Sequence, residues 1–248
     1  MEGLGKYFIF LHSMFVSRER FKIYTQRTLD ECITIGVSSL FIVAIVSIFT
    51  GAVSSIQIYY NLRSPLLRDF LVGYSVREMT ILESAPTVTA LIFAGRVGSS
   101  MAGQLGSMRI TEQIDALEIM GVNTSSYLVL PKILASLLTY PLLVIVAAFL
   151  AIYAGFLAAK FVVSVAPEDY IYGLRHAFNP YSIYFALYKS LAYAFLISSI
   201  SAYRGFYISG GALEVGKATT RAVTESCIAI LLADYVLTQL LLQSPLKI

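Results

Sequence analysis

Long apolar runs separated by short polar connections dominate this chain. Residues 32–62 and 133–159 contain no charged residue at all, and each run is longer than the roughly 20 residues that a helix needs to cross a hydrocarbon core. Three further runs are nearly as apolar and carry one or two charged residues each. The pattern therefore predicts an all-α membrane protein with five transmembrane helices, at residues 32–62, 79–104, 131–160, 181–203 and 222–243.

The first 30 residues show a shorter apolar stripe. Tyr7, Phe8 and Leu11 lie on one side of a helix that is too short to cross the membrane, and Lys and Arg occupy the other side and the segment that follows. Because the anionic lipids of the cytoplasmic leaflet attract basic side chains, we expect residues 1–30 to form an interfacial helix and a cytoplasmic tail.

The distribution of basic residues predicts the orientation of the chain. Of the 18 Lys and Arg residues, eleven fall on the N-terminal side of the membrane, six on the other side and one inside a span. Because basic residues concentrate on the cytoplasmic side, this excess predicts a cytoplasmic N-terminus and a periplasmic C-terminus.

Residues 110–121 interrupt the apolar pattern between the second and third predicted spans. One side of this segment carries apolar residues at helical spacing and another side carries three carboxylates, those of Glu112, Asp115 and Glu118. Thr111 is placed to cap the N-terminus of a helix, and Gly121 is placed to end it in the left-handed conformation. The segment is too short to span, so we expect a short cytoplasmic helix. Its carboxylates favour a basic protein partner over a lipid surface, the alternative being an ordinary solvated helical hairpin.

Composition excludes several classes of function. Hydrophobic residues make up 57% of the chain and charged residues 13%, whereas soluble domains are about one quarter charged. The net charge of +3 is small and the basic residues are dispersed, so nucleic acid is not expected as a partner. The His and Cys residues stand singly and no HExxH or GxSxG motif is present. We therefore expect no metal site and no catalytic residue in this chain.

One segment superficially matches a nucleotide-binding loop. Gly211–Ala218 follows the GxxxxGK[ST] pattern up to its last position, where Ala218 replaces the hydroxyl residue that binds magnesium. The segment also lies between two predicted membrane helices, whereas a phosphate-binding loop follows a buried strand. Nucleotide binding by this chain is therefore not expected.

Charged residues at membrane depth are candidates for function. Each costs on the order of 2.5–3.5 kcal/mol at the centre of a membrane helix, so such residues are expected to line a substrate path or a moving interface unless they reach the membrane surface. They are Glu83, Arg96, Lys189, Glu225 and Asp234. The second span also carries small residues at every fourth position, a spacing that allows close helix packing. These include Gly95, Ser99 and Gly103.

Several segments resemble the MlaE-type permeases, which are membrane subunits of ABC transporters that move lipids between bacterial membranes and, in relatives, in plastids. The resemblance is carried by Gly95–Gly98, Gln104–Gly106, Met108–Leu117 and Met120–Gly121, and it extends to Leu82–Pro86, Ala90–Arg96, Ala218–Arg221 and Asp234–Leu237. It covers nearly the whole chain and implies a single permease domain over residues 1–248. One position departs from the family, whose members often carry glutamate where this chain has Gln104, which suggests a packing or hydrogen-bonding role for the amide.

The resemblance implies a non-catalytic permease of the bacterial inner membrane that works within an assembly. The implied partners are a second copy of the chain, two copies of an ATPase subunit that holds ATP and magnesium, a periplasmic MCE-domain protein and a phospholipid substrate. Residues 110–121 would be the coupling helix. Its contacts to the ATPase would come from Arg109, Glu112, Gln113, Asp115 and Glu118. The lipid would occupy an apolar cavity at the dimer interface, lined chiefly by the first, second and fifth spans.

Two other functions are consistent with the pattern of residues. A self-sufficient secondary transporter or channel would use Asp234, Glu83 and Lys189 as proton or ion relays, and it would need no ATPase. A membrane-embedded lipid-modifying enzyme is disfavoured because no nucleophile, base and oxyanion donors occur at a recognisable spacing.

Overall fold

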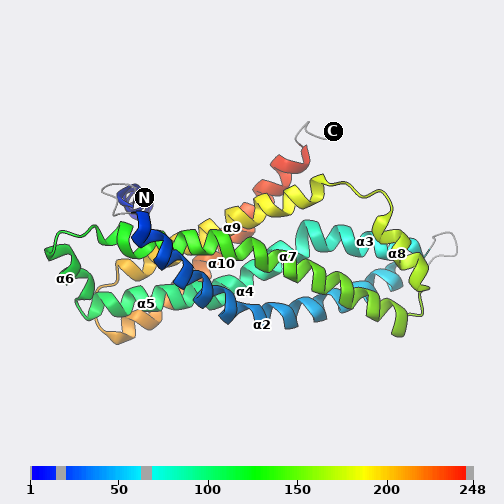
Figure 1. The fold of residues 1–248 in the computed structure, drawn as a ribbon, viewed down its shortest axis with the longest axis horizontal. Coiled ribbons are helices and arrows are strands. Elements are labelled where there is room, and N and C mark those ends of the chain that lie inside the picture. The colour runs from blue at the N-terminus through cyan, green and yellow to red at the C-terminus, as the bar shows by residue number, and fades with distance from the viewer. Residues whose placement is uncertain (1, 15–20, 63–68, 244–248) are drawn as a thin grey trace. The chain divides into compact units, whose positions relative to one another are not determined.

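The computed structural model describes residues 2–14, 21–62 and 69–243, and all regular structure in these ranges is helical (Figure 1). Three short segments are π-helices and are labelled η. The elements are α1 (Glu2–Ser13), α2 (Phe21–Asn61), α3 (Phe70–Met79), η1 (Thr80–Ser84), α4 (Ala85–Phe93), η2 (Ala94–Gly98), α5 (Ser99–Ile110), α6 (Gln113–Ile119), η3 (Ser125–Val129), α7 (Leu130–Phe161), α8 (Pro167–Arg175), α9 (Tyr181–Phe206) and α10 (Ala212–Gln243).

Four helical stretches in the described part of the chain are long and apolar enough to cross a membrane. They are Tyr24–Asn61, Ser125–Phe161, Tyr181–Phe206 and Ala212–Leu240, and they contain nearly all of the predicted first, third, fourth and fifth spans. The predicted second span, 79–104, lies in a stretch that is helical from Phe70 to Ile110 but is not one of the four. The all-helical class is therefore confirmed, and the count of five spans stays a prediction.

Several boundaries differ from the sequence-based prediction. The expected cytoplasmic tail is partly helical, because α2 already begins at Phe21. The connection after the third predicted span contains the short helix α8, whose first turn begins at Pro167, where the missing N–H costs no hydrogen bond. The last helix begins at Ala212, ten residues before the predicted span, and therefore includes most of the segment that resembles a nucleotide-binding loop.

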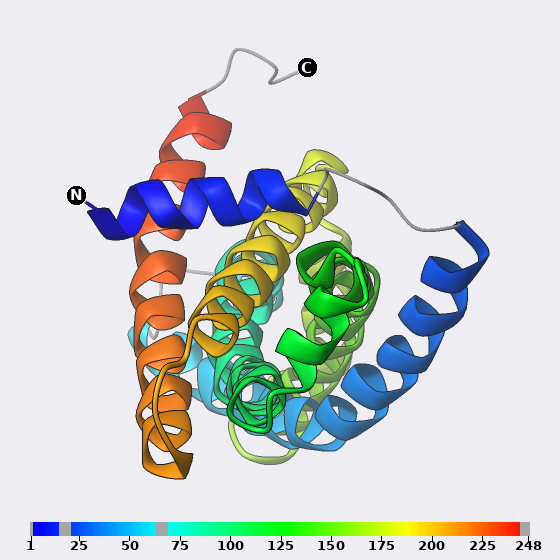
Figure 2. The ribbon, with the colours of Figure 1, turned by 90° about the vertical axis from the view of Figure 1, so that its left-hand side faces the viewer.

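The chain folds into two compact units. Unit 1 consists of Met1–Ser39, Ala90–Tyr140 and Leu191–Tyr235, and unit 2 of Leu40–Thr89, Pro141–Ser190 and Val236–Ile248. In unit 1, α1 runs across α9 (Figure 2). Tyr7 of α1 shares a 2.7 Å hydrogen bond with Ser199, and the buried ring of Phe10 packs against Tyr203 and Phe206. The N-terminal helix is thus anchored by aromatic packing, while Phe8 on its other side is exposed.

Unit 2 is built around the pairing of α3 with α8. Buried apolar side chains, among them Val76 and Tyr170, form its core. Gly173 of α8 lies so close to α3 that an added Cβ would sit 2.0 Å from the carbonyl oxygen of Phe70. The guanidinium of the buried Arg77 donates to the carbonyl oxygens of Leu174 and His176, at 2.7 and 2.9 Å, and so satisfies the C-terminal end of α8.

Candidate functional site

The chain changes direction between α5 and α6 at one residue whose backbone is in the left-handed conformation. Glu112 has φ = 57° and stands at the N-cap of α6. Thr111 does not cap α6, as the sequence predicted, but ends α5 and donates its hydroxyl to the carbonyl oxygen of Ser107 at 2.8 Å. Gly121 has φ = 81°, which confirms the predicted left-handed end. The helix therefore covers Gln113–Ile119, a shorter range than the predicted 110–121.

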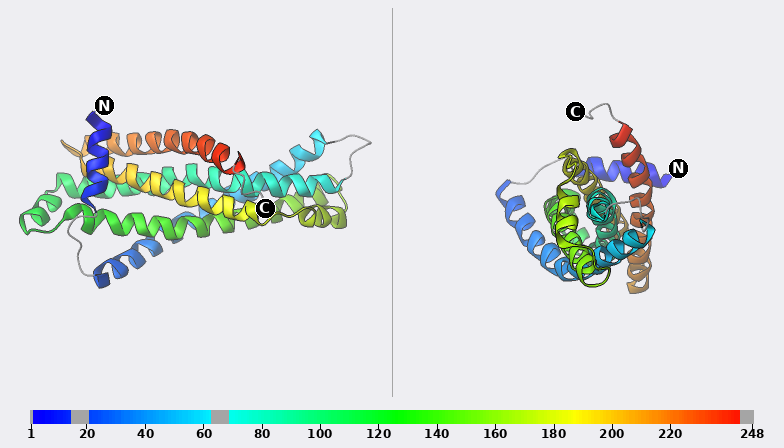
Figure 3. Two further views of the ribbon diagram at one scale, coloured as in Figure 1. Left: turned by 90° about the horizontal axis from the view of Figure 1, so that it is seen from above. Right: turned by 90° about the vertical axis from the view of Figure 1, so that its right-hand side faces the viewer.

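Both ends of α6 are attached to the neighbouring helices (Figure 3). Arg109 of α5 donates to Asp115 at 2.5 Å, and its Nη1 lies 4.0 Å from the carboxylate of Glu118. On the other side, Thr124 at the start of η3 donates to Glu118 at 3.0 Å. Ile114 is fully buried beneath the helix. A force on α6 is therefore delivered to both α5 and the η3–α7 helix.

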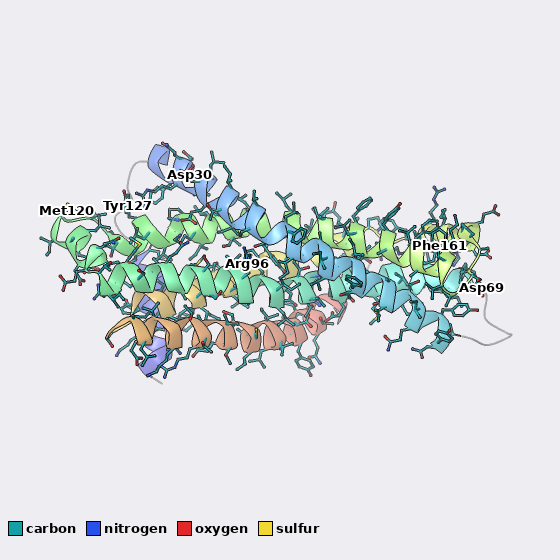
Figure 4. The ribbon with its side chains drawn as sticks, turned by 90° about the horizontal axis from the view of Figure 1, so that it is seen from below. Asp30, Asp69, Arg96, Met120, Tyr127 and Phe161 are labelled. Atoms are coloured by element: carbon teal, nitrogen blue, oxygen red, sulfur yellow. The ribbon has the colours of Figure 1, made fainter. Side chains whose placement is uncertain are left out.

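The outer surface of α6 combines acidic and apolar side chains. Glu112, Gln113 and Glu118 are exposed, and Ile119 and Met120 at its end are 87% and 69% exposed. Figure 4 shows Met120 at the tip, beyond the last turn of the helix. Of the residues predicted to contact a partner, Arg109 and Asp115 are bonded to each other and Glu118 accepts a hydrogen bond from Thr124, so Glu112 and Gln113 are the more available ones. The sequence pattern did not indicate the two apolar residues as part of this surface.

A cavity of about 690 Å³ lies beside α6 in unit 1. Its lining comes from the start of α2, from α5 and from the η3–α7 region, and it includes Arg27, Asp30, Glu31, Gln104 and Lys132. Asp30 and Tyr127 mark two of its walls (Figure 4). The guanidinium of Arg27 stacks 3.8 Å from the centre of the Tyr127 ring and donates to its hydroxyl. Sequence reasoning did not identify this cavity, because its residues come from segments far apart in the chain.

Two of the charged residues predicted at membrane depth meet in unit 2. The ammonium of Lys189, which is fully buried in α9, donates to Glu83 at 2.8 Å and to the carbonyl oxygen of Leu82 at 3.2 Å. Glu83 lies in the π-helical segment η1. Extra residues of this kind within helices occur frequently at functional sites. The structure thus joins these two candidates into one ion pair.

The other predicted charged residues have different partners, all in unit 1. Asp234 accepts a 2.5 Å hydrogen bond from the hydroxyl of Tyr193. Glu225 forms a two-pronged ion pair with Arg204, one of whose bonds is 2.6 Å long. Sequence reasoning named neither Tyr193 nor Arg204 as a site residue, since neither contact follows from spacing along one helix.

Arg96 occupies the second π-helical segment, η2. Its Nε donates to the backbone carbonyl of Ser38 in α2 at 2.9 Å. The residue is exposed, and Figure 4 shows its position on the helix that continues into α5. Within the described ranges no carboxylate forms an ion pair with it.

The close helix contacts use a different small-residue stripe from the predicted one. An added Cβ at Gly95 would meet nothing within 4 Å, and one at Gly103 would make only ordinary contact, at 3.5 Å from Thr219. The hydroxyl of Ser99 bonds back to the carbonyl of Gly95 in its own helix. The tight approaches within unit 1 involve Gly98 and Gly205. Among the described residues, Gly95 and Gly103 thus make no tight helix contact, and the close-packing role of Gly95, Ser99 and Gly103 stays a prediction.

Similarity to known proteins identifies the family of this chain. The family model described as Permease MlaE matches residues 28–240. The chain belongs to the MlaE permease family. Its apolar helices and this family membership make it a multi-pass membrane permease.

Relatives of this MlaE-family permease are known from bacteria and plastids. A probable ABC transporter permease protein of Rickettsia bellii is 34% identical over 96% of this chain and 92% of its own length. A probable ABC transporter permease protein of Synechocystis is 30% identical over 95% of this chain and 87% of its own length. The chloroplastic protein trigalactosyldiacylglycerol 1 of Arabidopsis thaliana is 31% identical over 90% of this chain and 63% of its own length.

Proposed function

We propose that this chain is the membrane subunit of an ATP-driven transporter that moves phospholipid or a related lipid between the inner and outer membranes, and so helps to maintain the lipid asymmetry of the outer membrane. ATP hydrolysis, with its magnesium, is assigned to a separate ATPase subunit present in two copies. The chain itself forms a homodimer and works with a periplasmic MCE-domain protein. The assignment of lipid rests on the family and on the Arabidopsis relative, whose name refers to a galactolipid.

The observation that supports this proposal most strongly is the construction of α6. A short helix with exposed carboxylates is held by polar contacts on both sides, through Arg109 and Thr124. A solvated hairpin would need neither the two attachments nor the exposed Ile119 and Met120. A helix built in this way suits the transfer of motion from a partner with basic and apolar side chains. We therefore assign α6 as the coupling helix that contacts the ATPase.

The membrane arrangement follows from the same proposal. The helical stretch Phe70–Ile110 is assigned as the further membrane-crossing segment, which gives five spans. Its Glu83 is paired with Lys189 and its Arg96 with a backbone carbonyl, so the charges that lower its mean hydropathy have polar contacts. Five spans with a cytoplasmic N-terminus place α6 in the cytoplasm and the C-terminus in the periplasm.

The test is a pull-down of the tagged chain from detergent-solubilised native membranes, read by mass spectrometry and by ATPase activity. The variant is Glu112→Lys/Gln113→Lys, which leaves the Arg109–Asp115 pair and the Thr124–Glu118 hydrogen bond in place. A matched control is Glu168→Lys/Asp169→Lys, which reverses two exposed carboxylates of α8. We expect the wild type and the control to bring down an ATPase and an MCE-domain protein, and the α6 variant to lose at least about 90% of the ATPase, as the introduction of two positive charges opposite a basic partner predicts.

The opposite results have defined meanings. If the wild type arrives without an ATPase under mild conditions, the ABC assignment is wrong. If both double variants lose the ATPase equally, α6 is not its docking site. Retention of the fold is checked by the elution volume and the melting temperature of each variant.

A self-sufficient transporter is the second candidate, favoured by the burial of Lys189 against Glu83. A proton or ion relay would use such a pair. It would show lipid or solute movement driven by a proton or sodium gradient in liposomes that contain this chain alone, a result that the ATP-driven mechanism does not predict.

A further inference from the structure

Lys132 connects three helices at one point of unit 1. It lies in the first turn of α7 and is 7% exposed. Its ammonium donates to the carboxylate of Glu31 in α2 and to Oε1 of Gln104 in α5, the latter at 2.8 Å. A nearly buried ammonium needs such partners, because an unpaired charge in this position is strongly unfavourable. We refer to Glu31, Gln104 and Lys132 together as the Lys132 junction.

The Lys132 junction joins the two helices that carry α6. Gln104 lies on α5 five residues before Arg109, which holds α6 through Asp115. Lys132 lies eight residues after Thr124, which holds α6 through Glu118. A movement of α6 that changed the angle between α5 and α7 would therefore act directly on the bond between Gln104 and Lys132.

Glu31, the third residue of the Lys132 junction, lies in α2. Tyr24 and Arg27 also connect α2 to η3, through Ser126 and Tyr127, both at 2.5 Å. Those two contacts join α2 to one neighbour, whereas the ammonium of Lys132 contacts α2 and α5 at the same time. The junction therefore carries a displacement of α5 relative to α7 into the first apolar span.

The surroundings of the junction allow its geometry to change. All three residues line the cavity of about 690 Å³, so their side chains border open space on one side. Gln104 is uncharged, which leaves the carboxylate of Glu31 as the charged member facing the ammonium. The amide of Gln104 can also present either its oxygen or its NH₂ group. It can therefore form a hydrogen bond with either a cation or an anion at position 132.

We propose that the Lys132 junction transmits the displacement of α6 to α2, with Glu31, Gln104 and Lys132 as positioning residues that couple ATP hydrolysis to lipid movement. This inference rests on the proposed function. It assigns the cytoplasmic end of α2, and the polar contact that holds it, to the moving part of the transporter.

The experiment uses the complete assembly with its ATPase, reconstituted into vesicles that contain a fluorescent phosphatidylethanolamine. The measured quantity is the ratio of lipid moved to ATP hydrolysed. For Lys132→Met we expect this ratio to fall about tenfold, within the range of usual coupling energies, while ATP hydrolysis changes less than about twofold. Lys160→Met removes an exposed lysine from the other end of α7 and should leave the ratio unchanged. Lys132→Arg should retain most of it.

A charge exchange separates transmission from simple stability. In Glu31→Lys/Lys132→Glu the amide of Gln104 can turn and donate to the new carboxylate, so the ratio should recover to within about threefold of the wild type. Adding Gln104→Glu to this background places two carboxylates together and should abolish the recovery. The exchange also serves as the test if Lys132→Met does not fold.

The contrary outcomes separate the two proposals. A wild-type assembly that couples normally, together with a Lys132→Met variant whose ratio is unchanged or whose ATPase and lipid movement fall in proportion, overturns the junction and leaves the proposed function intact. A charge exchange that folds but recovers no coupling also overturns the junction. A wild-type chain that binds no ATPase overturns the proposed function, and the junction with it.

Discussion

The ammonium of Lys189 lies 2.8 Å from Oε2 of Glu83, and the two side chains differ greatly in how completely the protein buries them. The side chain of Lys189 is fully buried, whereas that of Glu83 is 47% exposed. The ring of Phe185 lies 5.0 Å from the ammonium. The cation is therefore the member that depends more on the pair, because protein encloses the ammonium completely and the carboxylate only in part.

This asymmetry predicts unequal effects of removing the two partners. Glu83→Gln removes the carboxylate from a buried ammonium and should lower stability by about 1–3 kcal/mol, less than the roughly 3–5 kcal/mol for a fully buried pair because Glu83 is half exposed. Lys189→Met should cost less, since the carboxylate left behind is only half buried. Melting temperatures in detergent compare the single variants with the double variant, which should recover most of the loss. Equal losses in the two single variants would contradict the argument.

Gly205 of α9 and Gly95 of η2 predict opposite results for the same substitution. A Cβ at Gly205 would lie 2.7 Å from the carbonyl oxygen of Ala102, where backbone must move, so Gly205→Ala should destabilise the chain by about 1–3 kcal/mol. Gly95→Ala meets open space and should be neutral or stabilising by up to about 1 kcal/mol. Thermal melting of the two variants provides the measurement. A clear loss at Gly95→Ala would instead indicate that another chain covers this face.

The attachment of α6 can be tested without any partner. Arg109 and Asp115 are 32% and 44% exposed, so Arg109→Gln should change global stability by less than about 1 kcal/mol. Loss of the contact should nevertheless loosen α6 locally, and amide hydrogen exchange in residues 113–119 should become several-fold faster. The exchange rate of α8 serves as the internal control. Unchanged protection of α6 would show that the buried Ile114 holds the helix without the ion pair.

Tyr170 predicts a dependence of stability on alkaline pH. It lies in α8, outside the apolar spans, and burial raises the pKa of its hydroxyl far above the ordinary value, an effect that the neighbouring Ser55 hydroxyl partly opposes. The folded state therefore keeps this proton when the unfolded state loses it. The contribution is fully present below about pH 10 and is lost as the pH rises further. Melting curves between about pH 9 and pH 11 should fall more steeply for the wild type than for Tyr170→Phe. Parallel curves would contradict this assignment.

Periodicity predicted those features of the fold that depend on one helix at a time. The apolar runs indicated all five long helical stretches, and Gly121 was correctly assigned to a left-handed helix end. Thr111 was wrongly assigned as a cap, because residue type does not reveal that Glu112 takes the left-handed conformation that changes the chain direction. Helix α8 was missed because its nine residues are too few for a clear period.

The candidate site was predictable in composition but not in contacts. The five charged residues at membrane depth were identified from the sequence, yet the partners of Asp234 and Glu225 come from another helix. Close packing at Gly95 stays a prediction, because the tight approach within the chain occurs at Gly98 and periodicity alone does not show which of the two glycines faces a neighbouring helix. Lys132 was treated only as the start of a span, since its partners lie 101 and 28 residues away.

Because of its two π-helical segments, the stretch from Phe70 to Ile110 depends on its exact number of residues as well as on their identity. Each holds one residue more than an α-helical turn would, and one residue corresponds to a rotation of about 100° around the helix axis. Deleting one residue from η2 would shorten the Gly95–Gly98 segment by at most one residue and restore a regular helix. It would also turn α5 so that Gly106 leaves Ile208 and Gln104 leaves Lys132. A single-residue deletion here should therefore be more damaging than most substitutions, although the stretch would remain fully helical.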